Sequence, residues 1–206
     1  GAVTARALSH SGLSVIVIDG EDPKTATQAG FDGRASAIAA ASERLLSALD
    51  IWPHLVDQVS PILDIRVADG ASPLYLHYDH EDVGAGPLGY LAENRHIRLA
   101  ALAAVAADSN IQFMAPNRVE TLTRDHSGVS ATLSDGMEVQ ASLAVAADGR
   151  GSGVRKDAGI RVTGWRYPQE AIVCTVEHEL PHAFIAHEHF LPAGPFAILP
   201  LKGTAA

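Results

Sequence analysis

The chain has 206 residues, with 24 acidic side chains against 15 basic ones, and apolar residues make up 47% of it. This length suits one domain, or one domain and part of a second, and the apolar fraction excludes a disordered chain. The net charge of −9 argues against a nucleic-acid-binding protein, because such a protein needs a basic face to neutralise phosphates. The single cysteine, Cys174, excludes a disulfide within the chain.

The N-terminal segment has the pattern of half a βαβ unit. Residues 1–11 place small apolar side chains on one helical face, and Gly12 follows as a helix C-cap. The apolar run 13–18 then indicates a parallel strand buried on both faces, and it ends in Asp19. We expect the first strand of this unit to lie outside the chain. The run is too short for a membrane span or a signal peptide, which favours a cytoplasmic protein.

The middle of the chain alternates helices with short strands. Residues 34–49 have apolar side chains at helical spacing and residues 94–107 are rich in Ala and Leu, so both segments are predicted helices. A polar loop is expected over residues 20–33. The predicted strands are residues 62–67, 74–78 and 111–114, then a meander of 119–123, 129–134 and 137–141 with a hairpin turn at Asp135-Gly136.

A second apolar run, residues 143–147, also predicts a buried strand, and we expect it to share one parallel sheet with residues 13–18. Ser152 is the predicted N-cap of the helix that follows, and Gly159 ends that helix. From Thr163 the pattern becomes strand-like. The strands expected there are residues 171–176, which would bury Cys174, and residues 183–190 and 196–201.

Together these elements predict an α/β fold with two parts. Residues 1–162 form a Rossmann-like βαβ domain with a β-meander, and residues 163–206 begin a second, mostly antiparallel sheet.

Three places in this pattern have the chemistry to bind a phosphate or a ribose. Gly1 stands where a dinucleotide fingerprint has its last glycine, and Asp19 where it has its ribose-binding acid, although an ordinary buried αβ unit has the same pattern. Arg34 ends a glycine-containing segment, residues 30–34, at a predicted helix start; this suits a phosphate or simply an exposed arginine. Asp148-Gly149 lies between a predicted strand and a helix, where α/β proteins place ligands, but a simple turn has the same sequence.

Three histidines lie close together in the sequence near the C-terminus. His187 and His189 share a predicted strand face, with His182 and Glu188 nearby, so a metal site is conceivable. No second cluster completes a ligand shell, so we expect solvated or packing histidines and no metal. The sequence has no Gly-x-Ser-x-Gly elbow and no Walker loop, which removes the usual supports for acyl transfer and nucleotide hydrolysis.

Taken in order, the segments resemble those of the flavin-dependent aromatic hydroxylases of the p-hydroxybenzoate hydroxylase fold. Within that family they are most similar to the ubiquinone-biosynthesis (2-polyprenylphenol 6-hydroxylase-like) group. The resemblance is carried by residues 1–19, by FDGRASAIAAASERLLSALDIW, GYLAENRHIRLAAL and ADGRGSGVR, and by HFLPAGPFAILPL. It covers nearly the whole chain and implies an FAD-binding domain from the N-terminal half of such an enzyme, truncated at both ends.

The resemblance implies FAD as cofactor and NAD(P)H as co-substrate. The residues that it assigns to cofactor binding are Gly1, Asp19, Arg34, Glu93, Arg98, Asp148 and Gly149. Gly1 would lie beside the pyrophosphate, Asp19 would bind the adenosine ribose, and Arg34 would follow the phosphates and ribityl chain. Glu93, followed by Arg98, would lie on the flavin side, while the Asp-Gly pair belongs to a second motif tied to both FAD and the nicotinamide. The resemblance identifies no catalytic residue.

The implied activity is hydroxylation of a phenolic, isoprenoid-tailed ring with NAD(P)H and O₂. Peripheral association with the inner membrane or a biosynthetic complex is a further implication. Two alternatives remain open: a flavin-dependent isoprenoid reductase or dehydrogenase of the same fold, and a non-catalytic piece with an incomplete cofactor site. We expect the 206-residue chain alone to bind FAD weakly or not at all, because the backbone donors of the first turn lie outside it.

Overall fold

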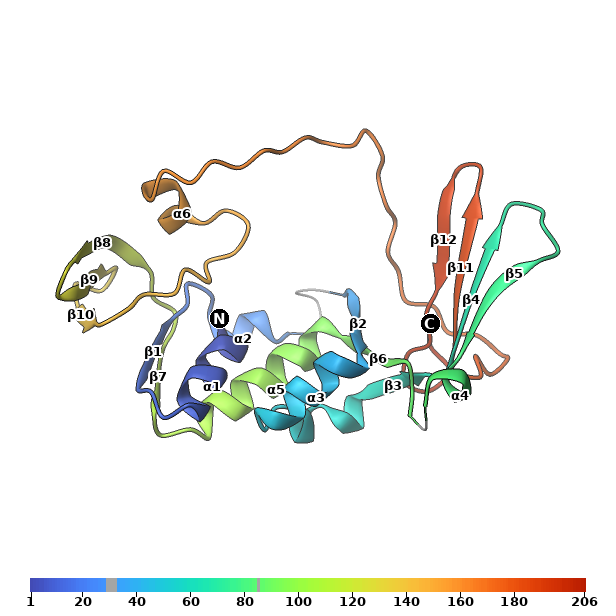
Figure 1. The fold of residues 1–206 in the computed structure, drawn as a ribbon, viewed down its shortest axis with the longest axis horizontal. Helices are drawn as coiled ribbons and strands as arrows, with labels where there is room; N and C mark the ends of the chain where they lie inside the picture. Colours follow the sequence, from blue (N-terminus) through green and yellow to red (C-terminus); the bar gives the residue numbers. More distant parts are fainter. Residues whose placement is uncertain (29–32, 85) are drawn as a thin grey trace. The chain divides into compact units, whose positions relative to one another are not determined.

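The computed structural model describes residues 1–28, 33–84 and 86–206 (Figure 1). Within these residues the chain divides into two compact units. The first unit comprises Gly1–Ala26 and Val105–Ile172, and the second comprises Thr27–Ala104 and Val173–Ala206. Both units are therefore assembled from segments that are far apart in the sequence.

The first unit contains a parallel pair of strands covered by a helix (Figure 1). Its elements here are α1 (Ala2–His10), β1 (Val15–Ile18) and β7 (Ile111–Met114), which pairs in parallel with β1. Ala5 of α1 is 3% exposed and packs with Val105 and Ile111, so the small residues of the helix allow a close approach to the strands. Gly12, with φ of 84°, ends the helix as predicted.

Two predictions about β1 are wrong: that it is buried on both faces, and that residues 143–147 form a strand in the same sheet. Ile16 is 39% exposed, because Val15 and Val17 pack on the α1 side and the alternate residue points away. Residues 143–147 form no strand: Leu143 is 74% and Val145 53% exposed, and no strand in the described part of the chain pairs with them. An apolar run becomes a strand only where a neighbour supplies backbone hydrogen bonds, and for β1 that neighbour is β7.

The predicted meander is confirmed. It consists of β8 (Val119–Asp125), β9 (Gly128–Leu133) and β10 (Glu138–Ala141), paired antiparallel in that order. The turn at Asp135-Gly136 is also confirmed, with Gly136 at φ of 84° and the Leu133 N–H bonded to the Met137 carbonyl at 2.8 Å. The Leu133 side chain is fully buried, which gives the meander its apolar face.

Two short helices complete the first unit. α6 (Gly153–Asp157) starts and stops as predicted: Ser152 Oγ accepts from the Arg155 N–H at 3.0 Å, and Gly159 follows the helix at φ of 68°. α2 (Pro23–Ala26) lies in the segment that was predicted as loop.

The second unit holds an antiparallel sheet in the order β2-β6-β3 and the helices beside it. These elements are β2 (Ala35–Ala39), α3 (Ala40–Ala48), the 3₁₀ turns η1 (Trp52–His54) and η2 (Val56–Gln58), β3 (Val59–Ile62), β6 (Gly89–Glu93) and α5 (Asn94–Ala106), of which the last two residues belong to the first unit. Ile51, Leu55 and Leu91 are at most 1% exposed and belong to its core.

The predicted helix over residues 34–49 is wrong in its first part. Residues 35–39 form β2, and only α3 is helical, so Arg34 precedes a strand and not a helix. Alanine and serine favour no strand by themselves, but pairing with β6, more than 50 residues later, and burial of Ile38 override local propensity. Residues 30–32 of the predicted phosphate loop lie outside the described residues.

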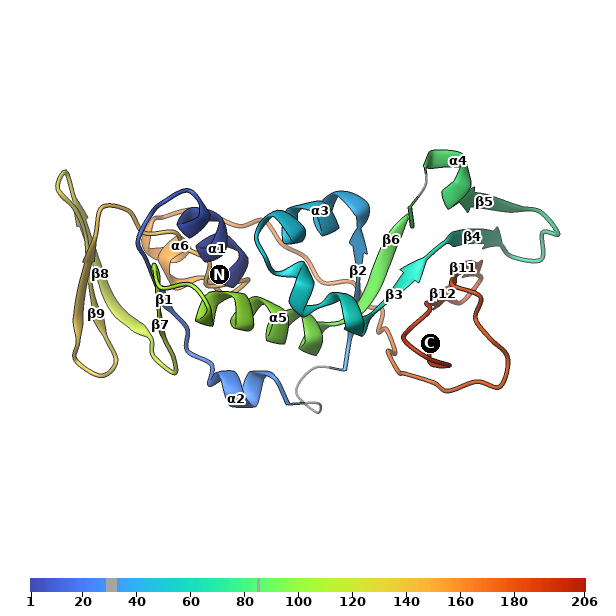
Figure 2. The same cartoon turned by 90° about the horizontal axis from the view of Figure 1, so that it is seen from below.

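A mixed sheet in the order β12-β11-β4-β5 forms the rest of the second unit (Figure 2). Its strands are β4 (Asp64–Asp69), β5 (Tyr75–Asp79), β11 (Ile185–Leu191) and β12 (Gly194–Ile198), and α4 (His80–Val83) follows β5. β4 and β11 are parallel and the other pairs antiparallel. The predicted strand 171–176 is wrong: Ile172 is 94% exposed and Cys174 is exposed, because no described strand pairs with that segment.

Across the described residues, none of the helices has the length and apolar character needed to cross a membrane.

Candidate functional site

The start of α1 and the end of β1 lie at the same end of the first unit. The turn at Gly12 reverses the chain, so α1 and β1 run in opposite directions. Gly1 is the N-cap of α1, supplies no side-chain acceptor, and has open space where a Cβ would stand. The N–H groups of a helix's first turn have no partner within the helix. This end of α1 therefore offers backbone donors and a partial positive charge to an anion.

Asp19 is fixed directly at the carboxyl end of β1. Its N–H donates to the Met114 carbonyl at 3.1 Å, and its carbonyl accepts from the Asn117 N–H at 2.8 Å. Its carboxylate Oδ1 accepts from the Glu21 N–H at 3.0 Å, while the residue stays exposed. The backbone and side chain of Asp19 are thus both oriented, in a position where a ligand can reach the carboxylate.

Sequence reasoning missed two residues beside Asp19. Asn117 is 7% exposed, and its Nδ2 donates to Asp135 Oδ2 at 2.8 Å. Its Oδ1 accepts from Ser134 Oγ at 2.7 Å and from the Arg118 N–H at 2.9 Å. Asn117 therefore joins the end of the parallel sheet to the meander turn and holds Arg118 next to Asp19. The available signal was position: both residues closely follow the predicted strand 111–114, at the edge where α/β proteins bind ligands.

Asp148 and Gly149 form a local turn in the first unit. Gly149 has φ of 78°, and Asp148 Oδ2 accepts from the Val154 N–H at 3.3 Å. A hydrogen bond from the Ser152 hydroxyl, more than any other contact, lowers the pKa of the Asp148 carboxyl below its ordinary value. These contacts direct the Asp148 carboxylate toward its own helix, α6.

The other predicted cofactor residues lie together in the second unit. The Arg34 carbonyl accepts from the Asn94 N–H at 2.9 Å, and Glu93 is paired with the residue that follows Arg34. Ser36 Oγ donates to Asn94 Oδ1 at 2.6 Å, which fastens the start of α5 to β2. Arg98 lies one turn into α5. The β2-β6 pairing therefore assembles a charged group from segments almost 60 residues apart.

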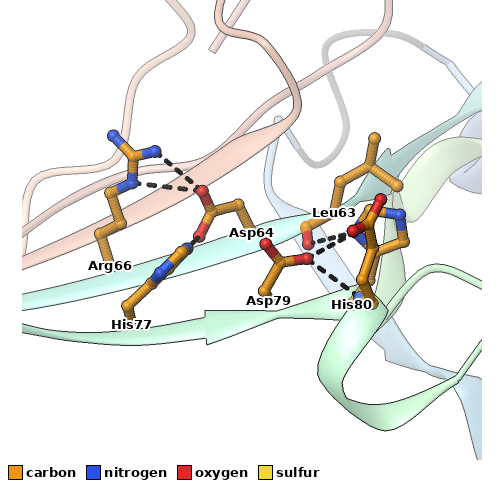
Figure 3. A network of polar contacts seen from close by, with 7 residues as sticks. Leu63, Asp64, Arg66, His77, Asp79 and His80 are labelled. Atoms are coloured by element: carbon orange, nitrogen blue, oxygen red, sulfur yellow. Dashed lines mark hydrogen bonds and ion pairs between the residues drawn. The ribbon is translucent and has the colours of Figure 1, made fainter.

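The mixed sheet of the second unit carries a polar network on one face (Figure 3). The Arg66 Nε and Nη2 donate to Asp64 Oδ2 at 3.2 and 2.9 Å, and His77 Nε2 lies 2.6 Å from Asp64 Oδ1. His80 Nδ1 lies 3.0 Å from the Leu63 carbonyl oxygen, next to Asp79 at 3.1 Å. Register puts Asp64, Arg66 and His77 on the same face, since alternate residues share a side.

A hollow of about 430 Å³ lies over this face of the sheet. Its lining residues are Arg66, Ala68, Tyr75, His187, Glu188, His189, Phe196 and Ile198. The Arg66 guanidinium carbon lies 5.8 Å from the centre of the Tyr75 ring, so the cation is held between a carboxylate and an aromatic face. The hollow thus combines aromatic walls with an oriented positive charge.

Two of the three C-terminal histidines, His182 and His189, contact backbone carbonyls. His189 Nε2 lies 2.7 Å from the Gly70 oxygen, and His182 Nε2 lies 3.0 Å from the oxygens of Leu201 and Gly203. His187 and His189 share a face of β11, as predicted. In the part of the chain that the structure describes, no three His, Cys, Asp or Glu side chains come together in a way that suits a metal ion.

The donor set of the first unit fits a dinucleotide such as FAD. The open start of α1 suits a pyrophosphate, and the exposed Asp19 carboxylate suits ribose hydroxyls. In the second unit, Arg34 and Arg98 provide charges of the sign that a phosphate requires.

A family model described as the FAD binding domain matches residues 1–204, and the chain belongs to this family. The predicted FAD-binding α/β fold is therefore confirmed. Ubiquinone hydroxylase UbiL from Rhodospirillum rubrum is 54% identical over 204 residues, which are 99% of this chain and 47% of the relative. The ubiquinone biosynthesis monooxygenase COQ6 from Rattus norvegicus is 30% identical over 222 residues, covering 99% and 46%. These matches confirm the resemblance to the ubiquinone group.

A solved structure supports the fold independently. A variant of PqsL from P. aeruginosa superposes with a TM-score of 0.83 at 19% identity, covering 99% of this chain and 55% of that protein. At this identity the likeness concerns the fold alone. The chain spans about half the length of the curated relatives that it matches.

Proposed function

We propose that this chain is the FAD-binding part of a monooxygenase that hydroxylates a phenolic, isoprenoid-tailed ring in ubiquinone biosynthesis. The observation that carries the proposal is the convergence of the α1 N-terminus and Asp19 at one end of the parallel strands. The names of the relatives, a ubiquinone hydroxylase and a ubiquinone biosynthesis monooxygenase, support the reaction class.

The proposed cofactor residues act on different parts of FAD. The first turn of α1, starting at Gly1, holds the pyrophosphate with backbone N–H groups, and Asp19 accepts hydrogen bonds from the adenosine ribose. Arg34 neutralises phosphate charge, with Glu93 and Arg98 on the flavin side. Asp148 and Gly149 complete the set from the turn before α6. Bound FAD supplies the redox chemistry, with NAD(P)H as reductant and O₂ as oxidant.

The phenolic ring would bind on the mixed sheet, which we assign to the substrate layer with residues 163–206 as its later part. Tyr75 and Phe196 provide aromatic walls, and Arg66 faces the same hollow. A guanidinium fixed by Asp64 favours the phenolate form of a ring hydroxyl, because a nearby positive charge stabilises the anion. An electron-rich phenolate is the form that reacts with an electrophilic oxygen donor. In this proposal the protein's part is to orient the ring for the reaction.

Peripheral membrane or complex association would give such an enzyme access to an isoprenoid-tailed substrate. We include this association in the proposal because a similar protein is named a ubiquinone hydroxylase.

The test uses a protein of the relatives' length that contains this chain. Supplied with FAD, NAD(P)H, O₂ and a polyprenylphenol, it should yield a hydroxylated product about 16 mass units heavier than the substrate. With ¹⁸O₂ in place of ¹⁶O₂ the gain should be about 18 mass units, because one oxygen atom of O₂ enters the ring. Consumption of NAD(P)H by the flavin without labelled product would refute the hydroxylase and favour a reductase. An Asp19→Ala variant separates loss of cofactor from loss of chemistry, because excess FAD should restore its activity.

A further inference from the structure

The backbone of Arg118 is held by hydrogen bonds at both its N–H and its carbonyl group. Its N–H donates to Asn117 Oδ1 at 2.9 Å and to Ser134 Oγ at 3.2 Å, and its carbonyl accepts from the Ser134 N–H at 2.9 Å. Asn117 is itself buried and bonded to the Asp19 carbonyl through its N–H at 2.8 Å. The base of the Arg118 side chain is therefore held in place relative to Asp19.

The Arg118 side chain runs across Gly20, the residue after Asp19. A Cβ placed on Gly20 would lie 2.9 Å from Arg118 Nε, 3.1 Å from Cζ and 3.1 Å from Cγ. Because Cγ, Nε and Cζ all lie within 3.1 Å of that point, the Arg118 side chain lies along the glycine and packs one face of its guanidinium against it. Only a residue without a side chain leaves room for this arrangement, so Gly20 and Arg118 act together.

The opposite face of the Arg118 guanidinium remains available. Arg118 is exposed, and among the residues that the structure describes its guanidinium makes no hydrogen bond or ion pair, not even with the carboxylate of Asp19. A cation and a carboxylate thus flank Gly20 without an ion pair between them in the described part of the chain. A planar guanidinium with one free face is suited to stacking on an aromatic ring.

We propose that Arg118 stacks on the adenine ring of the bound nucleotide and makes this end of the site selective for a purine. The inference rests on the proposed function in one respect, namely that Asp19 takes the ribose of the same nucleotide. The base is attached to that ribose, so a base bound beside Asp19 would lie within reach of the Arg118 guanidinium. The phosphates have other donors at the start of α1.

The test measures binding of two probes, by ligand-observed NMR, to the apoprotein of the relatives' length that contains this chain. AMP carries the adenine ring, whereas ribose 5-phosphate has the same sugar and phosphate without a base. Arg118→Gln should weaken AMP binding about two- to fivefold, the size of an exposed cation–π contact, and leave ribose 5-phosphate binding unchanged. Arg124→Gln is the matched control, because it removes the same charge from an exposed position at the far end of β8 and should change neither affinity.

A second variant displaces the guanidinium without removing it. Gly20→Ala puts a methyl group where Arg118 now lies, so AMP binding should again weaken while ribose 5-phosphate binding stays the same. Equal weakening of both probes by Arg118→Gln would assign the arginine to the phosphate and overturn the stacking proposal. No effect of Arg118→Gln on either probe would also overturn it.

The same experiment tests the proposed function separately, through a variant of Asp19. Asp19→Asn should weaken the binding of both probes, since both contain the ribose. If Asp19→Asn weakens both and Arg118→Gln affects neither, only the arginine inference fails. If the unaltered protein binds neither probe, the nucleotide site at this end of the first unit and the role of Arg118 are both refuted.

Discussion

Replacing Asn117 by alanine removes the side chain that joins the end of the parallel strands to the meander. Its amide makes three side-chain hydrogen bonds, at 2.7 to 2.9 Å, to Ser134, to the Arg118 N–H and to the Asp135 carboxylate. Because the residue is 7% exposed, water cannot replace all three partners after the substitution.

The expected cost follows from these bonds. A neutral hydrogen bond contributes about 1 kcal/mol net, and one to a charged group about 1.5–3 kcal/mol. Ser134 and Asp135 are exposed, so water recovers part of their loss, and the Arg118 N–H keeps a contact to Ser134 Oγ. We expect the free energy of unfolding of the first unit to fall by about 2–3 kcal/mol.

The assay is urea unfolding combined with hydrogen exchange of peptides from β8 and β9, which reports on the first unit specifically. Gln140→Ala is the control, since it removes an exposed amide from β10 of the same meander. A loss below about 0.5 kcal/mol for Asn117→Ala, the range of ordinary surface changes, would refute the reasoning. So would an equal loss for both variants.

Three further predictions concern other parts of the chain. In a protein of the relatives' length, Asp19→Ala should weaken FAD binding by on the order of 1.5–3 kcal/mol, and an unchanged affinity in a titration of the apoprotein would remove Asp19 from the site. Gly89→Ala should destabilise the β2-β6 pairing, because the new Cβ would lie 2.6 Å from a backbone carbonyl oxygen of β2, and a melting temperature equal to that of the unaltered chain would contradict this. The lowered pKa of Asp148 means that its contacts stabilise α6 above the ordinary carboxyl pKa and are lost as pH falls through the folded value. Exchange of the Val154 amide, corrected for its intrinsic rate, should therefore accelerate over that acidic range, and Ser152→Ala should remove much of the pH dependence.

Elements defined by neighbouring residues could be predicted from the sequence. The strand Ile111–Met114 has the predicted bounds, and the turn at Asp135-Gly136 lies where predicted. Gly12 and Ser152 end and begin helices as expected. These features depend on side-chain periodicity and on the backbone preferences of single residues, which need no information from the rest of the chain.

Strand partners could not be predicted in the same way. Residues 35–39 are rich in alanine and were predicted as helix, but their pairing with β6 makes them a strand. Residues 143–147 are more apolar, yet they form no strand because no described segment pairs with them. A strand is stabilised by hydrogen bonds to another segment, so its existence depends on residues that local patterns do not contain.

The same distinction between local pattern and tertiary contact applies to the candidate site. The order of helix, glycine turn, strand and acid was enough to bring Gly1 and Asp19 to one end, because a short turn forces the helix and strand to run in opposite directions. Only the tertiary structure placed Arg118 over Gly20, almost 100 residues earlier in the chain. That contact depends on the parallel pairing of β1 with β7 and on the buried amide of Asn117, both of which join segments that are distant in sequence.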